Sequence, residues 1–191
     1  ESLSGEPLEI GTQSWYGGEY GYGRLGLLNL SNLPITVIPE SIINLSEMES
    51  IDFSNTQIST IPESIGELSE LRSLICRGGQ LGGSIPTELG NLTNLRQVII
   101  EDTQLTGTIP SGLGNTNLMY LWLNNNQLTG EVPLEIWNIN ALYESGDPAD
   151  LRLIFRHNQL TGVIPESICD LNLRLDHYSY VDIRNNKFCP P

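Results

Sequence analysis

The stretch "LWLNNNQLTGEVP", from Leu121 to Pro133, recurs along the chain in altered form. Two near copies are "VIIEDTQLTGTIP" (Val98–Pro110) and "LIFRHNQLTGVIP" (Leu153–Pro165). The proline of the Ile-Pro or Val-Pro ending falls at 39, 62, 86, 110, 133 and 165, so the intervals are 23, 24, 24, 23 and 32 residues. A nearly constant period in this range is typical of a solenoid, in which each repeat forms one coil.

Each repeat contains three segments with different patterns. It opens with an apolar-x-apolar alternation, which predicts a short strand with one face inward. An Asn or Thr then turns the chain out of the sheet, and Asn126, Asn158 and Asn186 are placed to bond backbone groups of adjoining coils. After the proline, which we place in a first helical turn, apolar residues recur at roughly helical spacing. Stacked coils therefore share one core, with a parallel sheet on one side and short helical segments on the other.

The full pattern, LxxLxLxxNxLxGxIPxxLGxLxxL, resembles the leucine-rich repeat of the plant-specific type over about Leu25 to Pro191. This type occurs in plant receptor ectodomains, in polygalacturonase-inhibitor proteins and in secreted bacterial proteins. The resemblance implies an α/β solenoid that is curved and right-handed, with the parallel β-sheet on the concave face and short helical or 3-10 segments on the convex face. It also implies that partners bind on the concave face.

The chain departs from this family pattern in three places. The first two repeats lack the glycine of "LxGxIP", and no paired-cysteine cap precedes them. The ending "ESICDLN…NNKFCPP" looks like the tail of secreted bacterial repeat proteins.

We expect three regions along the chain. Residues 1–24, which include the Gly- and aromatic-rich "GTQSWYGGEYGYGRLG", do not scan as a repeat and are predicted to form an N-terminal cap. About six repeats occupy 25–180, and a last partial repeat with the C-terminal cap occupies 181–191. The long last interval predicts an insertion near 137–150, which we expect to form a loop beside the concave face.

Composition excludes several classes of function. The chain has 191 residues, 39% of them hydrophobic and 17% charged, which indicates one globular domain. No apolar run approaches the roughly 18 residues of a membrane span, and the net charge of −14 repels nucleic acid and anionic membranes. His157 and His177 lack a nucleophile at convincing spacing, and no metal-ligand or cofactor motif is present. We therefore expect no enzyme, no cofactor and no bound metal.

The three cysteines receive separate interpretations. Cys76 occupies an inward strand position and is expected to be a buried, inert thiol. In the family geometry, Cys169 and Cys189 can meet, so the resemblance implies a disulfide; two free thiols are the alternative. A disulfide would indicate an oxidising compartment and therefore a secreted or cell-surface protein. Three Asn-x-Ser/Thr triplets would be glycosylated only in a eukaryotic secretory route, and they begin at Asn29, Asn44 and Asn91.

The outward strand positions do not repeat, and they carry the functional hypothesis. The middle outward position forms a column that reads Asn29, Asp52, Ile75, Ile99, Trp122, Ile154 and Asp182. Neighbouring strands lie about 4.8 Å apart, so the four large apolar residues predict an exposed strip about 15 Å long. Exposed apolar patches mark contact surfaces, and aromatic residues with arginine are typical of interface hot spots. The candidate partner-binding residues are Ile75, Arg77, Ile99, Tyr120, Trp122, Asn124, Arg152, Ile154, Arg156, His157, Tyr180 and Arg184.

The leading hypothesis is a non-enzymatic extracellular recognition module that binds a protein or peptide on this strip. The arginines favour an acidic ligand. One alternative is a carbohydrate or cell-wall polysaccharide binder with an inhibitor-like role, in which Trp122 and Tyr120 stack on sugars. Another is a structural segment of a surface adhesin or filament, or a homodimer formed through the concave face. An ice-binding surface needs a regular Thr array, and the column of Thr106, Thr129 and Thr161 breaks at Gly82.

Overall fold

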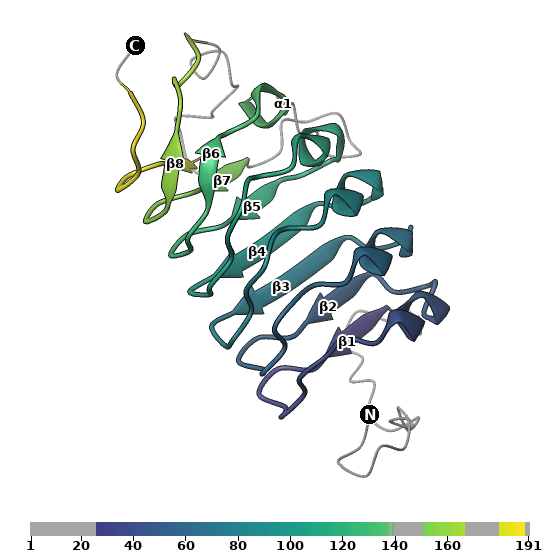
Figure 1. Ribbon diagram of the computed structural model, residues 1–191. Coiled ribbons are helices and arrows are strands. Elements are labelled where there is room, and N and C mark those ends of the chain that lie inside the picture. Colours follow the sequence, from purple (N-terminus) through teal and green to yellow (C-terminus); the bar gives the residue numbers. More distant parts are fainter. Residues whose placement is uncertain (1–25, 138, 140–150, 167–179, 190–191) are drawn as a thin grey trace.

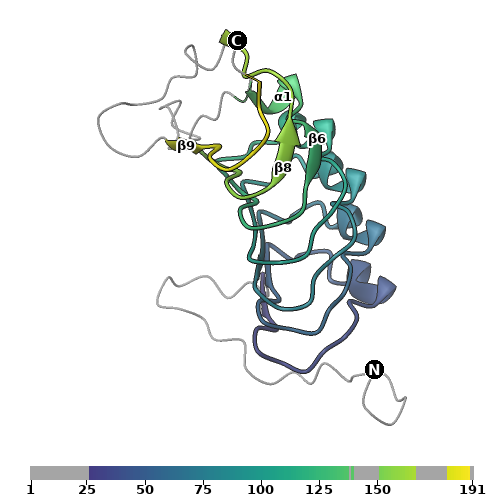
Figure 2. The same cartoon turned by 60° about the vertical axis from the view of Figure 1, so that its left-hand side comes forward.

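The computed structural model describes residues 26–137, 139, 151–166 and 180–189. In these ranges the chain forms a solenoid of stacked coils, with a β-sheet along one side (Figure 1). The helices stack along the opposite side (Figure 2). The prediction of a leucine-rich repeat solenoid with a parallel sheet is confirmed.

The main sheet contains seven strands in the order in which they occur in the chain, and every neighbouring pair is parallel. This order arises because each coil contributes one strand and stacks on the coil before it. The strands are β1 (Leu27–Asn29), β2 (Ser50–Asp52), β3 (Ser73–Arg77), β4 (Gln97–Glu101), β5 (Tyr120–Trp122), β7 (Arg152–Ile154) and β9 (Tyr180–Asp182). A second, two-stranded parallel sheet pairs β6 (Thr129–Glu131) with β8 (Gln159–Thr161).

Short helices form the convex side. They are the 3-10 helices η1 (Glu40–Asn44), η2 (Glu63–Glu67), η3 (Thr87–Asn91) and η4 (Ser111–Asn115), and the α-helix α1 (Leu134–Trp137). The repeated proline is the N-cap of each 3-10 helix, one residue before the first-turn position that we predicted. The reason is its extended ψ of 131 to 150°, which leaves the proline carbonyl free to accept the first helical hydrogen bond.

The buried asparagines join neighbouring coils, as predicted. The Asn126 side chain donates to the Ile100 carbonyl at 2.8 Å and accepts from the Leu105 amide at 3.1 Å. Asn158 likewise donates to the Leu123 carbonyl of the preceding coil at 2.8 Å. These bonds satisfy backbone groups that leave the sheet at the strand ends, where an unpaired buried group would be costly.

Two of the cysteines lie in the described residues. Cys76 is buried among the core side chains, and this burial, with the nearby Asp52 carboxylate, raises the pKa of its thiol to about 12. Cys189 is exposed and free within the part of the chain that the structure describes, and its proposed partner Cys169 lies outside that part. The Cys169–Cys189 disulfide therefore stays a prediction.

Other predictions also fall outside the described residues. The N-terminal cap over 1–24 lies wholly outside them, and of the insertion near 137–150 only Trp137 and Ile139 are described. None of the helices in the described ranges has the length and hydropathy of a membrane-spanning segment.

Candidate functional site

The register of the main sheet forms the middle column that the sequence predicted. The paired positions are Asn29 with Asp52, Asp52 with Ile75, Ile75 with Ile99, Ile99 with Trp122, Trp122 with Ile154, and Ile154 with Asp182. The preceding outward column, from Leu27 through Tyr120 to Tyr180, is in register in the same way. The column itself is therefore confirmed.

The exposure of this column differs from the prediction. Ile99 is only 1% exposed, although it lies on the outer face of the sheet and does not belong to the main core cluster. Ile75, Trp122 and Ile154 are half-buried. The prediction of a continuous exposed apolar strip is therefore wrong at Ile99.

Arg77 and Trp122 meet across the strand that carries Ile99. The guanidinium carbon of Arg77, on β3, lies 5.7 Å from the centre of the Trp122 ring, on β5. Strand β4 lies between them, so both side chains must lean over it to meet. Arg77 also forms an ion pair with Glu101 on β4, with 3.0 Å between Nε and Oε1. Ile99 faces outward from this same strand, and in the register it pairs with Ile75 on one side and with Trp122 on the other.

Tyr120 and Arg152 extend this cluster. The rings of Tyr120 and Trp122 meet edge to face, with 6.4 Å between centroids and an interplanar angle of 85°. The guanidinium carbon of Arg152 lies 5.7 Å from the centre of the Tyr120 ring. Each ring therefore has an arginine against it. A sugar that stacked on these rings would compete with the arginines for the ring faces.

A second cluster surrounds Asp182 on β9. Asp182 is 3% exposed, and its carboxylate accepts from Arg184 Nε at 2.9 Å and from a terminal nitrogen of Arg184 at 2.7 Å. A terminal nitrogen of Arg156 lies 3.8 Å from the same carboxylate. The side chains of Arg156 and Arg184 remain 42% and 67% exposed. Asp182 thus orients two arginines that still face solvent.

Sequence reasoning missed the role of Asp182. The available signal was an acid in the middle column beside arginines of the next outward column. The burial of the Asp182 side chain beside two guanidinium groups depends on side-chain packing. The position of Asp182 in the column does not predict that packing.

The remaining candidates take different positions. Asn124 is buried, so its side chain offers no surface for contact with a partner. His157 is exposed at a positive φ of 56°, and its ring lies 3.0 Å from the Asn185 side-chain nitrogen. Only the backbone of Tyr180 is described.

The arginines of the described ranges are confined to one side of the solenoid. Every arginine in the described ranges lies in a strand of the main sheet or within two residues of one. By contrast, η1 to η4 and α1 contain no basic residue and carry Glu40, Glu63, Glu67, Glu88 and Glu135. In a chain of net charge −14, the concave side is thus where the positive charge gathers.

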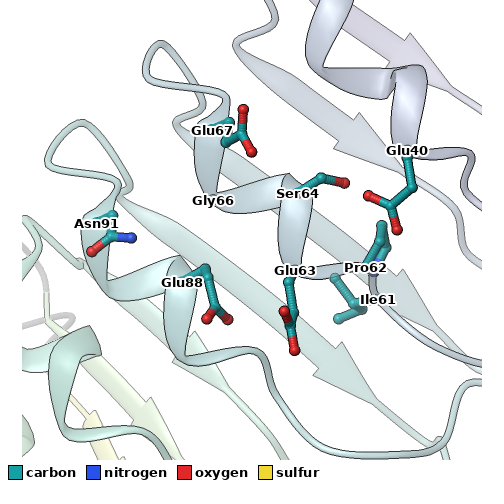
Figure 3. A pocket seen from close by; sticks show the side chains of 9 residues that line it. All are labelled: Glu40, Ile61, Pro62, Glu63, Ser64, Gly66, Glu67, Glu88 and Asn91. Atoms are coloured by element: carbon teal, nitrogen blue, oxygen red, sulfur yellow. The ribbon is translucent and has the colours of Figure 1, made fainter.

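The convex side has a shallow acidic hollow between η1, η2 and η3 (Figure 3). Glu40, Glu63, Glu67 and Glu88 line it, together with Ser64. Nowhere in the described ranges do three or more His, Cys, Asp or Glu side chains converge as a metal site would require. The hollow is therefore a feature of the outer surface, on the side opposite to the arginine and aromatic clusters.

Comparison with known proteins matches two family models. One, described as a leucine-rich repeat region, matches residues 23–115. The other, described as a leucine-rich repeat, matches residues 117–139 and 151–171. A search of curated proteins found no match.

Solved structures with the same architecture include plant receptor ectodomains. One is the ectodomain of the Arabidopsis thaliana receptor kinase GASSHO1/SCHENGEN3, solved in complex with CASPARIAN STRIP INTEGRITY FACTOR 2. Its sequence is 28% identical to this chain and the TM-score is 0.73; the match covers 84% of this chain and 18% of that one. The Arabidopsis receptor kinase HAESA, in complex with the peptide hormone IDA and the co-receptor SERK1, is 29% identical with a TM-score of 0.70, covering 87% and 27%.

A plant ice-binding protein is 24% identical with a TM-score of 0.69, covering 85% of this chain and 57% of that one. At this identity the likeness shows the fold alone. The chain spans less than two thirds of the length of each of these three structures.

Proposed function

Because the chain belongs to the leucine-rich repeat family, we propose that it is a non-enzymatic extracellular recognition module. It binds a protein or peptide partner on the C-terminal half of the concave face, between β3 and β9. Similar plant ectodomains support this proposal, since HAESA was solved with a peptide hormone on an ectodomain of the same architecture. The comparison covers only part of those receptors, so the partner must be argued from this chain's own residues.

The observation that carries the proposal is the cluster of rings and guanidinium groups on the sheet. Trp122, Tyr120, Arg77 and Arg152 contact one another across three strands and remain partly exposed. The scaffold does not need large side chains at these outward positions, because β2 forms the same sheet with Ser50 and Asp52 at the equivalent places. Partly exposed Trp, Tyr and Arg around a buried apolar centre have the composition of an interface hot spot.

The charges on this face favour an acidic partner. Arg77, Arg156 and Arg184 keep substantial exposure while they pair with Glu101 and Asp182. The pairs fix the guanidinium positions and neutralise part of their charge, so the attraction acts at short range. A partner with carboxylates beside apolar side chains would match both features of the face.

An affinity capture tests this proposal. The wild-type protein, a Trp122→Ala/Arg156→Glu double variant and a convex-side control, Glu63→Gln/Glu88→Gln, are immobilised after circular dichroism has shown that all three are folded. Secreted and surface proteins of the source organism are then passed over them. Any captured protein is purified, and its affinity for each variant is measured by calorimetry.

We expect the wild type and the convex control to bind equally and the concave variant to lose at least about 2 kcal/mol of binding free energy, which is the usual size of a hot-spot effect. Equal binding by all three variants would place the site elsewhere. If nothing is captured and the wild type alone elutes as a dimer, the face is an assembly contact and the recognition proposal is wrong.

A further inference from the structure

Trp122 pairs in the sheet register with a buried apolar residue that lies outside the main core cluster. Ile99 faces the concave side, is 1% exposed and does not belong to the main core cluster. Its neighbours in the sheet register are Ile75 and Trp122, and the Trp122 ring meets the half-exposed Arg77 side chain across β4, so these two side chains are placed to cover it. A cover made of two surface side chains can move without disturbing the coils beneath it, since both strands keep their backbone hydrogen bonds.

This closed arrangement leaves hydrogen-bond donors unpaired. The Trp122 indole nitrogen Nε1 is shielded from solvent and has no hydrogen-bond partner among the described residues. The same holds for Arg156 Nε, two residues beyond Ile154, which pairs with Trp122 in the sheet register. Buried donors without partners are rare and unfavourable, and each one calls for a physical explanation. Both are donors, so the group that satisfies them must be an acceptor.

From these contacts we infer that Trp122 is a movable lid over an apolar subsite, and that Arg77 holds it closed. When the lid opens, Ile99 forms the floor of the subsite and Ile75 borders it. The partner fills it with an aliphatic side chain, and a neighbouring carboxylate accepts hydrogen bonds from the indole N–H and from Arg156. The identity of the partner group rests on the proposed function, whereas the lid itself rests only on the geometry of this chain.

The carboxylate is favoured over a neutral carbonyl by the charges around the subsite. Arg77 and Arg156 both keep exposure on this part of the face, and each already has one acidic partner, Glu101 for Arg77 and Asp182 for Arg156. An incoming carboxylate could accept a hydrogen bond from Arg156 Nε, which has no partner among the described residues. An incoming ammonium group could not satisfy the two unpaired donors, Trp122 Nε1 and Arg156 Nε, because it offers no acceptor.

The lid is tested with the dye 1-anilinonaphthalene-8-sulfonate, which combines apolar rings with an anionic sulfonate. Arg77→Gln removes both the contact with the Trp122 ring and the ion pair with Glu101. Arg72→Gln is the matched control, because it removes the same charge beside the same strand and loses only a 3.9 Å ion pair to Glu49. We expect dye fluorescence to rise several-fold in Arg77→Gln and to stay near the wild-type value, or fall slightly, in Arg72→Gln.

The direction of this change is diagnostic. Loss of a positive charge alone weakens the binding of an anionic dye, so a rise in Arg77→Gln requires that apolar surface has been uncovered. Adding Ile99→Thr, which keeps the β-branched shape but not the apolar floor, should abolish the rise. The inference is overturned if the two single variants behave alike, or if the dye still binds after Ile99→Thr. Thermal unfolding of each variant excludes a general loss of packing as the cause of dye binding.

The partner group is tested by displacement of the dye from Arg77→Gln. An acetylated peptide of alternating leucine and glutamate is compared with a leucine–lysine peptide of the same length. We expect the glutamate peptide to displace the dye at a much lower concentration. Equal displacement by both peptides would overturn the carboxylate assignment.

The outcomes for the lid and for the proposed function are separable. A dye response confined to Arg77→Gln and dependent on Ile99 supports the lid even when a captured partner binds elsewhere, in which case only the proposed function fails. If capture depends on Trp122 and Arg156 but the dye does not distinguish Arg77→Gln from Arg72→Gln, the recognition site stands and the lid is wrong.

Discussion

Arg77 contacts the ring of Trp122 at 5.7 Å, although strand β4 separates the two strands that carry them. The contact spans the strand that carries the buried Ile99 and joins side chains of separate strands into one cluster. The described arginines of this face have partners within the chain, so the face is organised before any partner arrives. Interfaces with prearranged side chains lose less conformational entropy on binding.

Replacing Asp182 by asparagine should destabilise the C-terminal end of the sheet. The substitution keeps the size of the side chain but removes the charge that Arg184 and Arg156 share. Because both arginines retain contact with water, we expect a loss of about 1–2 kcal/mol, below the cost of breaking a fully buried pair. Urea unfolding measures it. The control Asp102→Asn, at an exposed site with a φ of 57° that asparagine tolerates, should change stability by less than about 0.5 kcal/mol.

Removing the side chain of Asn126 should be among the most damaging polar changes. Its amide donates to the Ile100 and Leu123 carbonyls and accepts from the Leu105 amide, all of them buried. Asn126→Ala would remove this partner from the Ile100 carbonyl and the Leu105 amide, whereas the Leu123 carbonyl keeps its bond from Asn158. We expect a cost of about 2–4 kcal/mol in urea unfolding. Asn117→Ala, which breaks one exposed bond to the Thr93 carbonyl, should cost about 1 kcal/mol or less. Similar costs for the two would refute the bridging role of Asn126.

Glycine at 90 is required by the stacking of η3 on η4. A Cβ added at Gly90 would lie 2.7 Å from the Gly112 Cα, so one helix would have to move. We expect Gly90→Ala to lower the free energy of unfolding by about 1–3 kcal/mol. Gly82→Ala is the matched control, because its added Cβ would meet nothing closer than 3.6 Å and its φ is not positive. Calorimetry should show Gly82→Ala to be neutral or slightly stabilising.

The buried thiol of Cys76 should make stability fall at alkaline pH. The pKa of this thiol is about 12 in the folded state, against 9.0 for an unperturbed thiol, because burial and the Asp52 carboxylate disfavour the thiolate. The folded state therefore holds the proton to a higher pH than the unfolded state does. The free energy of unfolding then decreases as pH rises from about 9 to about 12. Cys76→Ala should lose this extra slope, and parallel pH profiles would contradict the assignment.

A peptide map under non-reducing conditions tests the Cys169–Cys189 disulfide. We expect the two cysteines in one cross-linked peptide and Cys76 as a thiol that iodoacetamide modifies only after unfolding. A disulfide that closes a loop of about 20 residues would raise the free energy of unfolding by roughly 3 kcal/mol, and reduction of the disulfide should remove this increase. Rapid alkylation of both Cys169 and Cys189 in the native protein would show instead that they are free.

The sequence predicted the scaffold well because each repeat contains the residues that specify its own strand, turn and helix. The alternation around Leu121 and Leu123 specifies a strand, Asn126 specifies the exit from the sheet, and Pro133 precedes a helix. A fixed period then places equivalent residues of successive coils side by side, so the register follows from counting. The position of the proline was off by one residue, since a 3-10 turn starts from the carbonyl of an extended proline.

The sequence by itself therefore determined the coils, the parallel sheet and the residues of each outward column, because these depend on contacts within one repeat and between adjacent repeats. Only the tertiary structure decided which of those residues are exposed. Ile99 and Asp182 are buried on a face where long side chains select among several partners, as Arg77 does when it reaches past β4 to Trp122. Rotamer choices of this kind depend on the surrounding packing, which is defined only once the coils are stacked.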